Sequence, residues 1–204
     1  ALNSYASSTP AVDKDRVYVA WATTQKVTLR ALKHDGTDLW DIDLGTFTSQ
    51  HGFGTSPMVY RDMVVMANDQ MDKSFLVAVD GATGKIRWKR RRATFRRAAY
   101  GVPCVYTPPG GKDQLIFNSG LHGITSIDPQ TGEKNWGISL FDKRSVSCPI
   151  IVAGLIYGTC GSGGGGNYVV AVRPPGEGPD EKEPKVAYKI DRAAPYTPTS
   201  VACG

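Results

Sequence analysis

Residues 78–88 read AVDGATGKIRW and residues 126–136 read SIDPQTGEKNW, and the two stretches align without a gap. Each contains an aspartate, Asp80 or Asp128, followed by a threonine and then a glycine. An aspartate can hydrogen-bond the backbone of its own turn, and a glycine adopts positive φ without strain. The pattern therefore predicts a tight β-hairpin with a bulge at both places.

A tryptophan follows each turn, four residues after Gly84 and Gly132. We expect it on the outermost strand of a sheet, where a large flat side chain can cover a neighbouring sheet. Aromatic residues recur at this point of the chain with spacings of 48, 48 and 52 residues, at Trp40, Trp88, Trp136 and Tyr188. Because a longer turn precedes Tyr188 and tyrosine replaces tryptophan there, the fourth contact should be weaker.

A second series runs in phase with the first and consists of prolines followed by apolar residues. Its spacings are 47, 46, 46 and 49 residues, and its members are Pro10, Pro57, Pro103, Pro149 and Pro198. Two series with one period indicate an internal repeat. Each unit holds four short runs rich in β-branched and aromatic residues, and no window keeps an apolar period of 3.6 residues.

Four-stranded units of this length are typical of β-propeller blades. We therefore predict an all-β propeller over residues 1–204, with about four four-stranded antiparallel blades. The expected blades cover approximately residues 4–45, 53–92, 100–141 and 145–191. Residues 195–204 are expected to form the first strand of a further blade.

Composition agrees with a turn-rich globular chain. The 204 residues include 23 Gly and 13 Pro, and 24 basic against 19 acidic residues give a net charge of +5. Disorder, collagen and coiled coil are excluded by this composition. The longest apolar stretch, residues 149–158, contains a proline and two glycines and is far shorter than the roughly 20 residues that cross a bilayer. We expect no transmembrane segment.

The turn motif resembles that of the PQQ-like β-propeller repeat family, Ala-x-Asp-x-x-Thr-Gly-x-x-x-Trp. Residues 78–88 match every fixed position, and in residues 126–136 only Ser126 departs from it. The family includes quinoprotein alcohol dehydrogenases and the lipoprotein propeller of bacterial outer-membrane assembly. The resemblance implies a periplasmic or otherwise extracytoplasmic location, although no signal peptide opens this sequence. It also implies a ring of seven or eight blades, of which this chain is an incomplete arc whose partners are the remaining blades of a longer chain. The residues with an implied structural docking role are Trp40, Trp88, Trp136, Tyr188, Gly84, Gly132, Asp80 and Asp128.

Quinoprotein dehydrogenases of this fold hold PQQ between a tryptophan face and a disulfide of two adjacent cysteines, with Ca²⁺ nearby. Here no two of the four cysteines are adjacent, and only Trp21 is left for stacking. We predict no cofactor and no metal site, with PQQ and Ca²⁺ as the alternative. No catalytic triad or carboxylate pair can be assembled from the spacing, so no catalytic residue is predicted.

Two cysteines flank a predicted hairpin in the fourth unit. Cys148 precedes its first strand and Cys160 ends its second, so an antiparallel turn would bring them nearly opposite. A disulfide between them is one hypothesis, and two buried free thiols are the other.

The segment KRRRATFRR, residues 89–97, holds six of the 24 basic residues. It is either a solvated loop or a patch for an anionic partner, such as a glycan or an acidic protein. Nucleic acid is not expected as a partner, because Phe95 is the only aromatic residue within the segment.

Loops from successive blades of a propeller converge around its axis, so polar loop residues of one face could line a common pocket. The candidates for this ligand face are His51, Asn68, Asp69, Arg96, Arg97, Asn118, His122 and Arg144. Solvated loop residues without a common ligand are the alternative. We interpret the chain as a non-catalytic binding or scaffold module acting outside the cytoplasm. A quinoprotein dehydrogenase fragment and a propeller that binds anionic glycans are the alternatives.

Overall fold

The computed structural model describes residues 7–23, 25–93, 98–176 and 181–202. These residues contain sixteen β-strands and no helix, arranged as four four-stranded antiparallel sheets. The predicted all-β architecture of four blades is confirmed. The chain divides into two compact units, the first containing residues 1–102 and 130–132 and the second residues 103–129 and 133–204.

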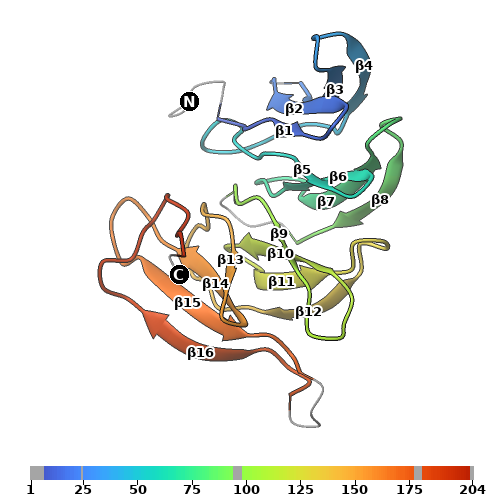
Figure 1. Cartoon of the computed structure of the whole chain (residues 1–204). Coiled ribbons are helices and arrows are strands. Elements are labelled where there is room, and N and C mark those ends of the chain that lie inside the picture. Colours follow the sequence, from blue (N-terminus) through green and yellow to red (C-terminus); the bar gives the residue numbers. More distant parts are fainter. Residues whose placement is uncertain (1–6, 24, 94–97, 177–180, 203–204) are drawn as a thin grey trace. The chain divides into compact units, whose positions relative to one another are not determined.

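The first unit holds two sheets, in each of which the strands pair in chain order (Figure 1). The first sheet consists of β1 (Ala11–Val12), β2 (Arg16–Ala22), β3 (Val27–Lys33) and β4 (Asp38–Asp43). The second consists of β5 (Met58–Tyr60), β6 (Met63–Asn68), β7 (Phe75–Asp80) and β8 (Ile86–Arg91). One hydrophobic core joins them, and its fully buried side chains include Tyr18, Leu29, Val64 and Met66.

The second unit repeats this arrangement (Figure 1). Its first sheet consists of β9 (Cys104–Tyr106), β10 (Gln114–Ser119), β11 (Gly123–Ile127) and β12 (Lys134–Ile138). Its second consists of β13 (Ile150–Val152), β14 (Leu155–Cys160), β15 (Tyr168–Arg173) and β16 (Lys185–Ile190). Its core includes Ile116, Ile124, Ile156 and Val172, each of which is fully buried.

Burial falls from the middle of a sheet to its outer strand. Every residue of β6 is buried, in agreement with its nearly continuous apolar sequence MVVMAN, whereas every residue of β16 is exposed. A strand packed on both faces needs apolar side chains on both, while an outer strand alternates or is polar. The middle strands thus bury most of the apolar surface, and the outer strands form most of the exposed surface.

A β-bulge at the same place in every sheet explains the spacing of the turn motif. In each outer pair the register shifts just before the aromatic residue, and that residue lies opposite a small one. Trp88 is paired with Ala78, which is the first fixed position of the motif. The other pairs are Trp40 with Ala31, Trp136 with Ser126 and Tyr188 with Ala171. Because opposite residues share a face of the sheet, a small partner leaves room for the ring.

The first strand of a further blade, expected over residues 195–204, stays a prediction. Residues 195–202 form no strand. An inner strand is held by hydrogen bonds to the second strand of its own sheet, and residues 195–202 have no such neighbour in the described part of the chain. Instead, the hydroxyl of Tyr196 accepts a hydrogen bond from Arg144, and that of Thr199 accepts one from the amide of Cys148. Nowhere in the described ranges is there a helix of the length and apolar character that a bilayer crossing requires.

Candidate functional site

The best-formed polar site in the first unit begins where β6 ends. Asp69 follows this strand, and its Oδ2 lies 3.1 Å from Nη1 of Arg92, which follows β8. Both side chains are buried, with 7% and 8% of their surface exposed. Asp69 was predicted as a ligand-face carboxylate, but its charge is matched by Arg92. One atom of each group, Oδ1 of Asp69 and Nη2 of Arg92, has no hydrogen-bond partner among the described residues.

Gln70 fixes the loop that follows. Its buried amide donates to the carbonyl oxygens of Thr46 (2.8 Å) and Lys73 (3.1 Å) and accepts from the amide of Thr48 (2.8 Å). Its backbone exchanges two further hydrogen bonds with the hydroxyl of Ser74. The β6–β7 loop and the connection after β4 are therefore held together by one side chain, which gives the surface they share a defined shape.

A cavity of about 730 Å³ lies on this framework, wholly within the first unit. Its wall comes from the end of β4, the β6–β7 loop and the end of β8. The charged residues of the wall are Asp72, Lys73, Lys89, Arg91 and Arg92, and the others are Leu44, Gly45, Thr46, Ser74 and Phe75. Four cations thus face one carboxylate.

Lys89 is the best-defined cation of this wall. Its ammonium lies 3.8 Å from the centre of the Phe75 ring and 3.4 Å from the carbonyl oxygen of Leu44. Burial, and after it the neighbouring charge of Arg91, lowers the pKa of Lys89. The cavity therefore holds positive charge in a partly desolvated place, where a negative ligand would be attracted more strongly than at an open surface.

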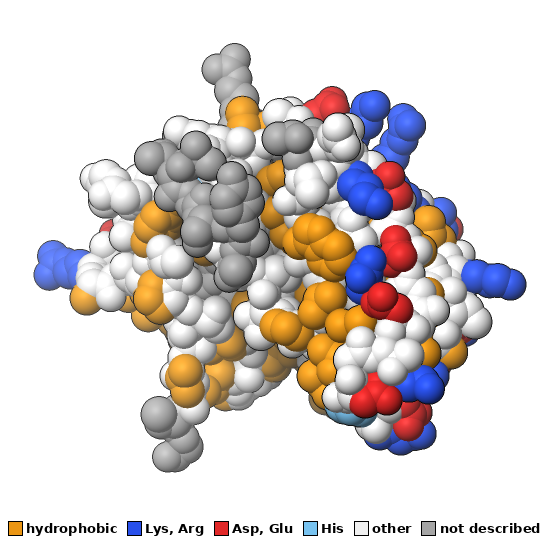
Figure 2. Space-filling view, turned by 90° about the horizontal axis from the view of Figure 1, so that it is seen from above, with side chains coloured by type: hydrophobic (Ala, Val, Ile, Leu, Met, Phe, Trp, Pro, Cys, Tyr) orange, Lys and Arg blue, Asp and Glu red, His pale blue; other side chains and the backbone are white. Residues whose placement is uncertain are grey.

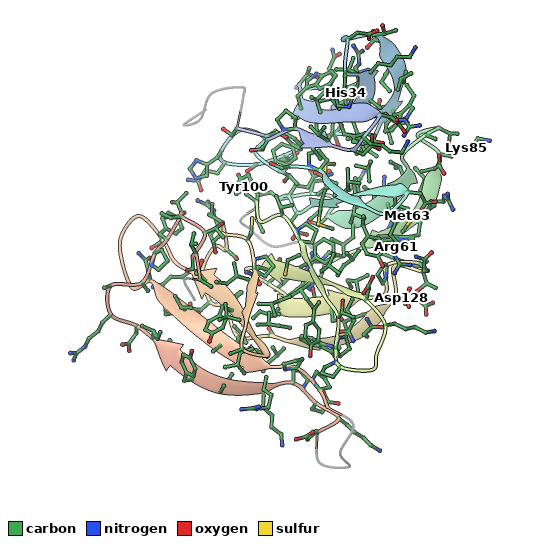
Figure 3. All side chains as sticks on the ribbon, viewed as in Figure 1. His34, Arg61, Met63, Lys85, Tyr100 and Asp128 are labelled. Carbon is green, nitrogen blue, oxygen red and sulfur yellow. The ribbon has the colours of Figure 1, made fainter. Side chains whose placement is uncertain are left out.

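The other ligand-face candidates of this unit lie in two environments. Asn68 is fully buried, and neither polar atom of its side chain has a partner in the described part of the chain. His51 is half-buried in a loop, and its backbone amide donates a hydrogen bond to the hydroxyl of Ser49. The same hydroxyl lies 3.0 Å from that of Tyr100. Tyr100 and the hairpin residue Lys85 lie on opposite sides of this unit (Figure 3). Arg96 and Arg97 lie outside the described residues.

The remaining candidates belong to the second unit. Asn118 is buried against Gly158, whose lack of a Cβ leaves room for the Asn118 amide. His122 is half-buried in the β10–β11 turn. Arg144 bridges Gly161 through the backbone and donates to the hydroxyl of Tyr196 at 3.1 Å. The convergence of these three with those of the first unit stays a prediction.

The tryptophans of the first unit contact the turns of the following sheets. The indole Nε1 of Trp40 donates a hydrogen bond to the carbonyl oxygen of Gly81 at 3.0 Å. The Trp40 ring also packs on Gly84 so closely that a Cβ on this residue would be only 2.8 Å from the ring atoms. The Trp88 ring packs on Gly132 in the same way, and a Cβ on Gly132 would be 2.5 Å from the ring. Both glycines have a φ of 71°, so the backbone and the ring each favour glycine.

The aromatic residues of the second unit are held differently. Trp136 is buried, but its indole donates to the side chain of Gln114, which belongs to its own sheet (2.9 Å). Tyr188 is 44% exposed, and its hydroxyl lies 2.7 Å from that of Tyr157 in the same sheet. The sequence predicted a weaker fourth contact, whereas the role of Gln114 has no signal in the repeat.

The motif aspartates organise their turns. Oδ1 of Asp80 accepts hydrogen bonds from the amide and the hydroxyl of Thr83, both at 2.8 Å, while Oδ2 contacts Arg87. The hydrogen bond from Arg87, and then those from Thr83, lower the pKa of Asp80 to about 2. In the third sheet the amide of Asp128 donates to the carbonyl oxygen of Glu133 at 2.8 Å, as the amide of Asp80 does to that of Lys85.

The hypothesis of a Cys148–Cys160 disulfide is wrong, because both residues are free thiols in the structure. The register of β13 on β14 pairs Ile150 with Tyr157. Continued by two residues, it sets Cys148 opposite Thr159, and adjacent residues of a strand point to opposite faces. Cys160 instead packs in the core, where its Sγ accepts the amide of Lys143 at 3.2 Å. Burial raises its pKa.

The cavity residues at the end of β8 belong to the predicted basic segment, but the sequence did not single out Lys89, Arg91 and Arg92 within it. Gln70 and Lys73 were missed because nothing in the repeat marks them. In the described part of the chain, no three His, Cys, Asp or Glu side chains gather as a metal site would need.

Comparison with known proteins identifies the family. A family model described as outer membrane protein assembly factor BamB matches residues 2–176. The chain belongs to this family. Within the BamB family, it is 26% identical over 101 residues to the outer membrane protein assembly factor BamB of Francisella salina. That match covers 50% of this chain and 17% of the Francisella protein.

Solved structures share the fold of this BamB-family chain. BamB from Moraxella catarrhalis superposes with a TM-score of 0.62 and 16% identity, covering 95% of this chain and 53% of that one. The quinohemoprotein alcohol dehydrogenase from Comamonas testosteroni gives a TM-score of 0.60 and 17% identity, covering 90% and 34%. The chain thus spans about half the length of the Moraxella protein. These likenesses support a PQQ-like propeller repeat, the predicted resemblance.

Proposed function

We propose that this chain is a non-catalytic, extracytoplasmic module that binds protein partners, in the manner of a scaffold. The observation that carries the proposal is where the carboxylates with displaced pKa values lie. Carboxylates of the described residues with displaced pKa values sit in turns and loops rather than in reactive pairs. The Tyr168 hydroxyl, 2.7 Å from Asp142, lowers the pKa of that carboxyl, and hydrogen bonds from Thr37 do the same for Asp35.

Displaced pKa values often mark catalytic sites, but structural ion pairs and turns displace them too. Here each displacement has a structural cause. Basic and acidic side chains are interspersed on the right-hand part of the face shown in Figure 2, so that part offers both signs of charge to a protein partner. The family name describes assembly of outer membrane proteins, a role that depends on contacts between proteins.

The dehydrogenase alternative has less support from the residues present. Trp21, the tryptophan left for stacking a quinone, has the guanidinium of Arg30 over its ring at 5.4 Å. The cysteines Cys104, Cys148 and Cys160 are free thiols, and no two of them are neighbours in the sequence, so they do not provide the adjacent pair. We therefore propose that the chain works without PQQ.

Two measurements test the proposal. In an equilibrium titration of the purified chain with PQQ and Ca²⁺, followed by absorbance, we expect no saturable uptake. In quantitative pull-downs from a solubilised envelope extract of the source organism, we expect proteins that are retained by the folded chain and not by the heat-unfolded chain. Stoichiometric uptake of PQQ, or identical retention by the folded and unfolded chains, would overturn the proposal.

A further inference from the structure

The cavity between the end of β4, the β6–β7 loop and the end of β8 has the features of a built binding site. Its shape is fixed by the hydrogen bonds of the Gln70 side chain. Two backbone hydrogen bonds add to them: the amide of Met71 donates to the carbonyl oxygen of Thr48 (2.8 Å), and the amide of Arg92 donates to that of Ser74 (2.9 Å). Binding to such a wall costs little reorganisation, because its loops are already ordered.

The net positive charge of the wall favours a negatively charged ligand. Lys73, Lys89 and Arg91 are exposed around the cavity, and Arg92 lies buried at its edge with Nη2 unpartnered among the described residues. Asp69 neutralises only Arg92, so the three exposed cations face two carboxylates, that of Asp72 in the wall and that of Asp43, whose charge acts on Lys89.

The donors available favour carboxylates over phosphate. A phosphate site usually gathers several backbone amides around the anion. Here the nearby amides of Gly45, Thr48 and Arg92 already donate to Asp43, Gln70 and Ser74. The charged donors of the wall are side-chain cations, and a planar guanidinium such as that of Arg91 can bind a carboxylate through two hydrogen bonds, as it can a phosphate. Asp72 further disfavours a ligand of high charge density.

The size of the cavity favours a peptide over a single small ion. A volume of about 730 Å³ lies within the range of about 300–1,000 Å³ of sites that enclose ligands of many atoms. Leu44 and Phe75 line the cavity but are almost fully buried, and the ammonium of Lys89 covers the Phe75 ring. The surface offered to a ligand is therefore mainly that of the cations, and a peptide with several acidic side chains can reach more than one of them at once.

We propose that this cavity binds an acidic peptide segment of a protein partner through Lys73, Lys89 and Arg91, an inference that rests on the protein-binding role proposed above. The carboxylates of the segment pair with the three cations.

The test is fluorescence anisotropy with a labelled hexapeptide, Glu-Leu-Glu-Glu-Leu-Glu, and its counterpart with glutamine at the four glutamate positions. We expect saturable binding of the acidic peptide only, weakening as NaCl is raised from 50 to 200 mM. Lys89→Gln and Arg91→Gln should each weaken binding by about tenfold, the loss expected for one charge-assisted hydrogen bond. Lys85→Gln is the matched control. It removes the same charge from the far end of the β7–β8 hairpin, outside the cavity, and should leave affinity unchanged.

Equal binding of the glutamine peptide, or an equal loss of affinity in Lys85→Gln, would overturn the inference. Displacement of the acidic peptide by inorganic phosphate, or by a heparin octasaccharide, at a lower concentration than that of unlabelled peptide needed for the same effect would also overturn it. Because Arg91 is exposed, its variant should keep the wild-type melting temperature, whereas Lys89→Gln also loses the contacts with the Phe75 ring and the Leu44 carbonyl oxygen, so its binding is measured well below its own melting temperature. If partners are still retained in pull-downs by the double variant Lys89→Gln/Arg91→Gln, the cavity assignment fails while the scaffold role stands. Stoichiometric PQQ uptake would remove the scaffold role itself.

Discussion

Glycine at the tip of the motif turn serves two purposes, backbone conformation and contact with a ring, and two positions separate them. Gly36 and Gly84 both have positive φ, 88° and 71°. A Cβ on Gly36 would meet nothing within 4 Å, whereas one on Gly84 would lie 2.8 Å from the Trp40 ring. The backbone cost is thus shared, and the ring contact belongs to Gly84 alone.

We therefore expect Gly36→Ala to lower the free energy of unfolding by about 1–2 kcal/mol, the cost of a left-handed conformation. Gly84→Ala should lower it by a further ~1–3 kcal/mol, because the methyl group forces the indole to move. Urea denaturation followed by circular dichroism measures both. Equal losses for the two variants would show that the ring contact contributes nothing.

Asp80 links the motif turn to pH. Because its pKa is lowered from 3.8 to about 2 in the folded chain, by Arg87 and then by Thr83, its ionised form stabilises the fold. This stabilisation is complete above pH 3.8 and is lost as the pH falls towards 2. We expect Asp80→Asn to cost about 1 kcal/mol at pH 7, because the hydrogen bond from Arg87 is lost and those from Thr83 to an uncharged amide oxygen are weaker. In urea melts between pH 4 and pH 2, the free energy of unfolding of the variant should also fall less steeply with decreasing pH than that of the wild type. A wild-type slope in the variant would assign this acid sensitivity to other groups.

At the level of the strand, β8 and β16 differ in what lies against them: the Trp88 ring contacts Gly132 in the turn of the next sheet, whereas no sheet follows β16 in the described part of the chain. Both are outer strands, but Trp88 is 5% exposed and Tyr188 is 44% exposed. Val186 and Ile190 are also about half exposed, so β16 buries little apolar surface of its own. Strands with few buried contacts open at low free energy.

Hydrogen exchange followed by mass spectrometry should therefore show faster exchange in β16 than in β8, with β6 and β7 the slowest of the four. The order follows burial, since every residue of β6 is buried and every residue of β16 is exposed. Protection of β16 equal to that of β8 would mean that Tyr188 anchors its strand as well as Trp88 does.

These strands also show how far the sequence could lead. The hairpins were predictable because aspartate, threonine, glycine and tryptophan act within eleven residues of chain. The cavity was not, because its shape depends on Gln70, whose partners Thr46 and Thr48 lie in another loop. For the same reason, Asn68 and Asn118 looked like loop residues, but the ends of β6 and β10 that carry them are buried.

At the scale of the whole molecule, each unit has its own hydrophobic core, with Leu29 in the first and Ile156 in the second, both fully buried. In repeat proteins, stability is a sum over units and their nearest neighbours, so a cavity made in one core should loosen that unit first. Leu29→Ala and Ile156→Ala should each cost about 2–5 kcal/mol. Hydrogen exchange should then accelerate in β2 and β3 for Leu29→Ala, and in β14 and β15 for Ile156→Ala, with the other unit little changed. If either variant speeds exchange equally in all four strands, the chain opens as one cooperative body, and the two cores do not act as separate sources of stability.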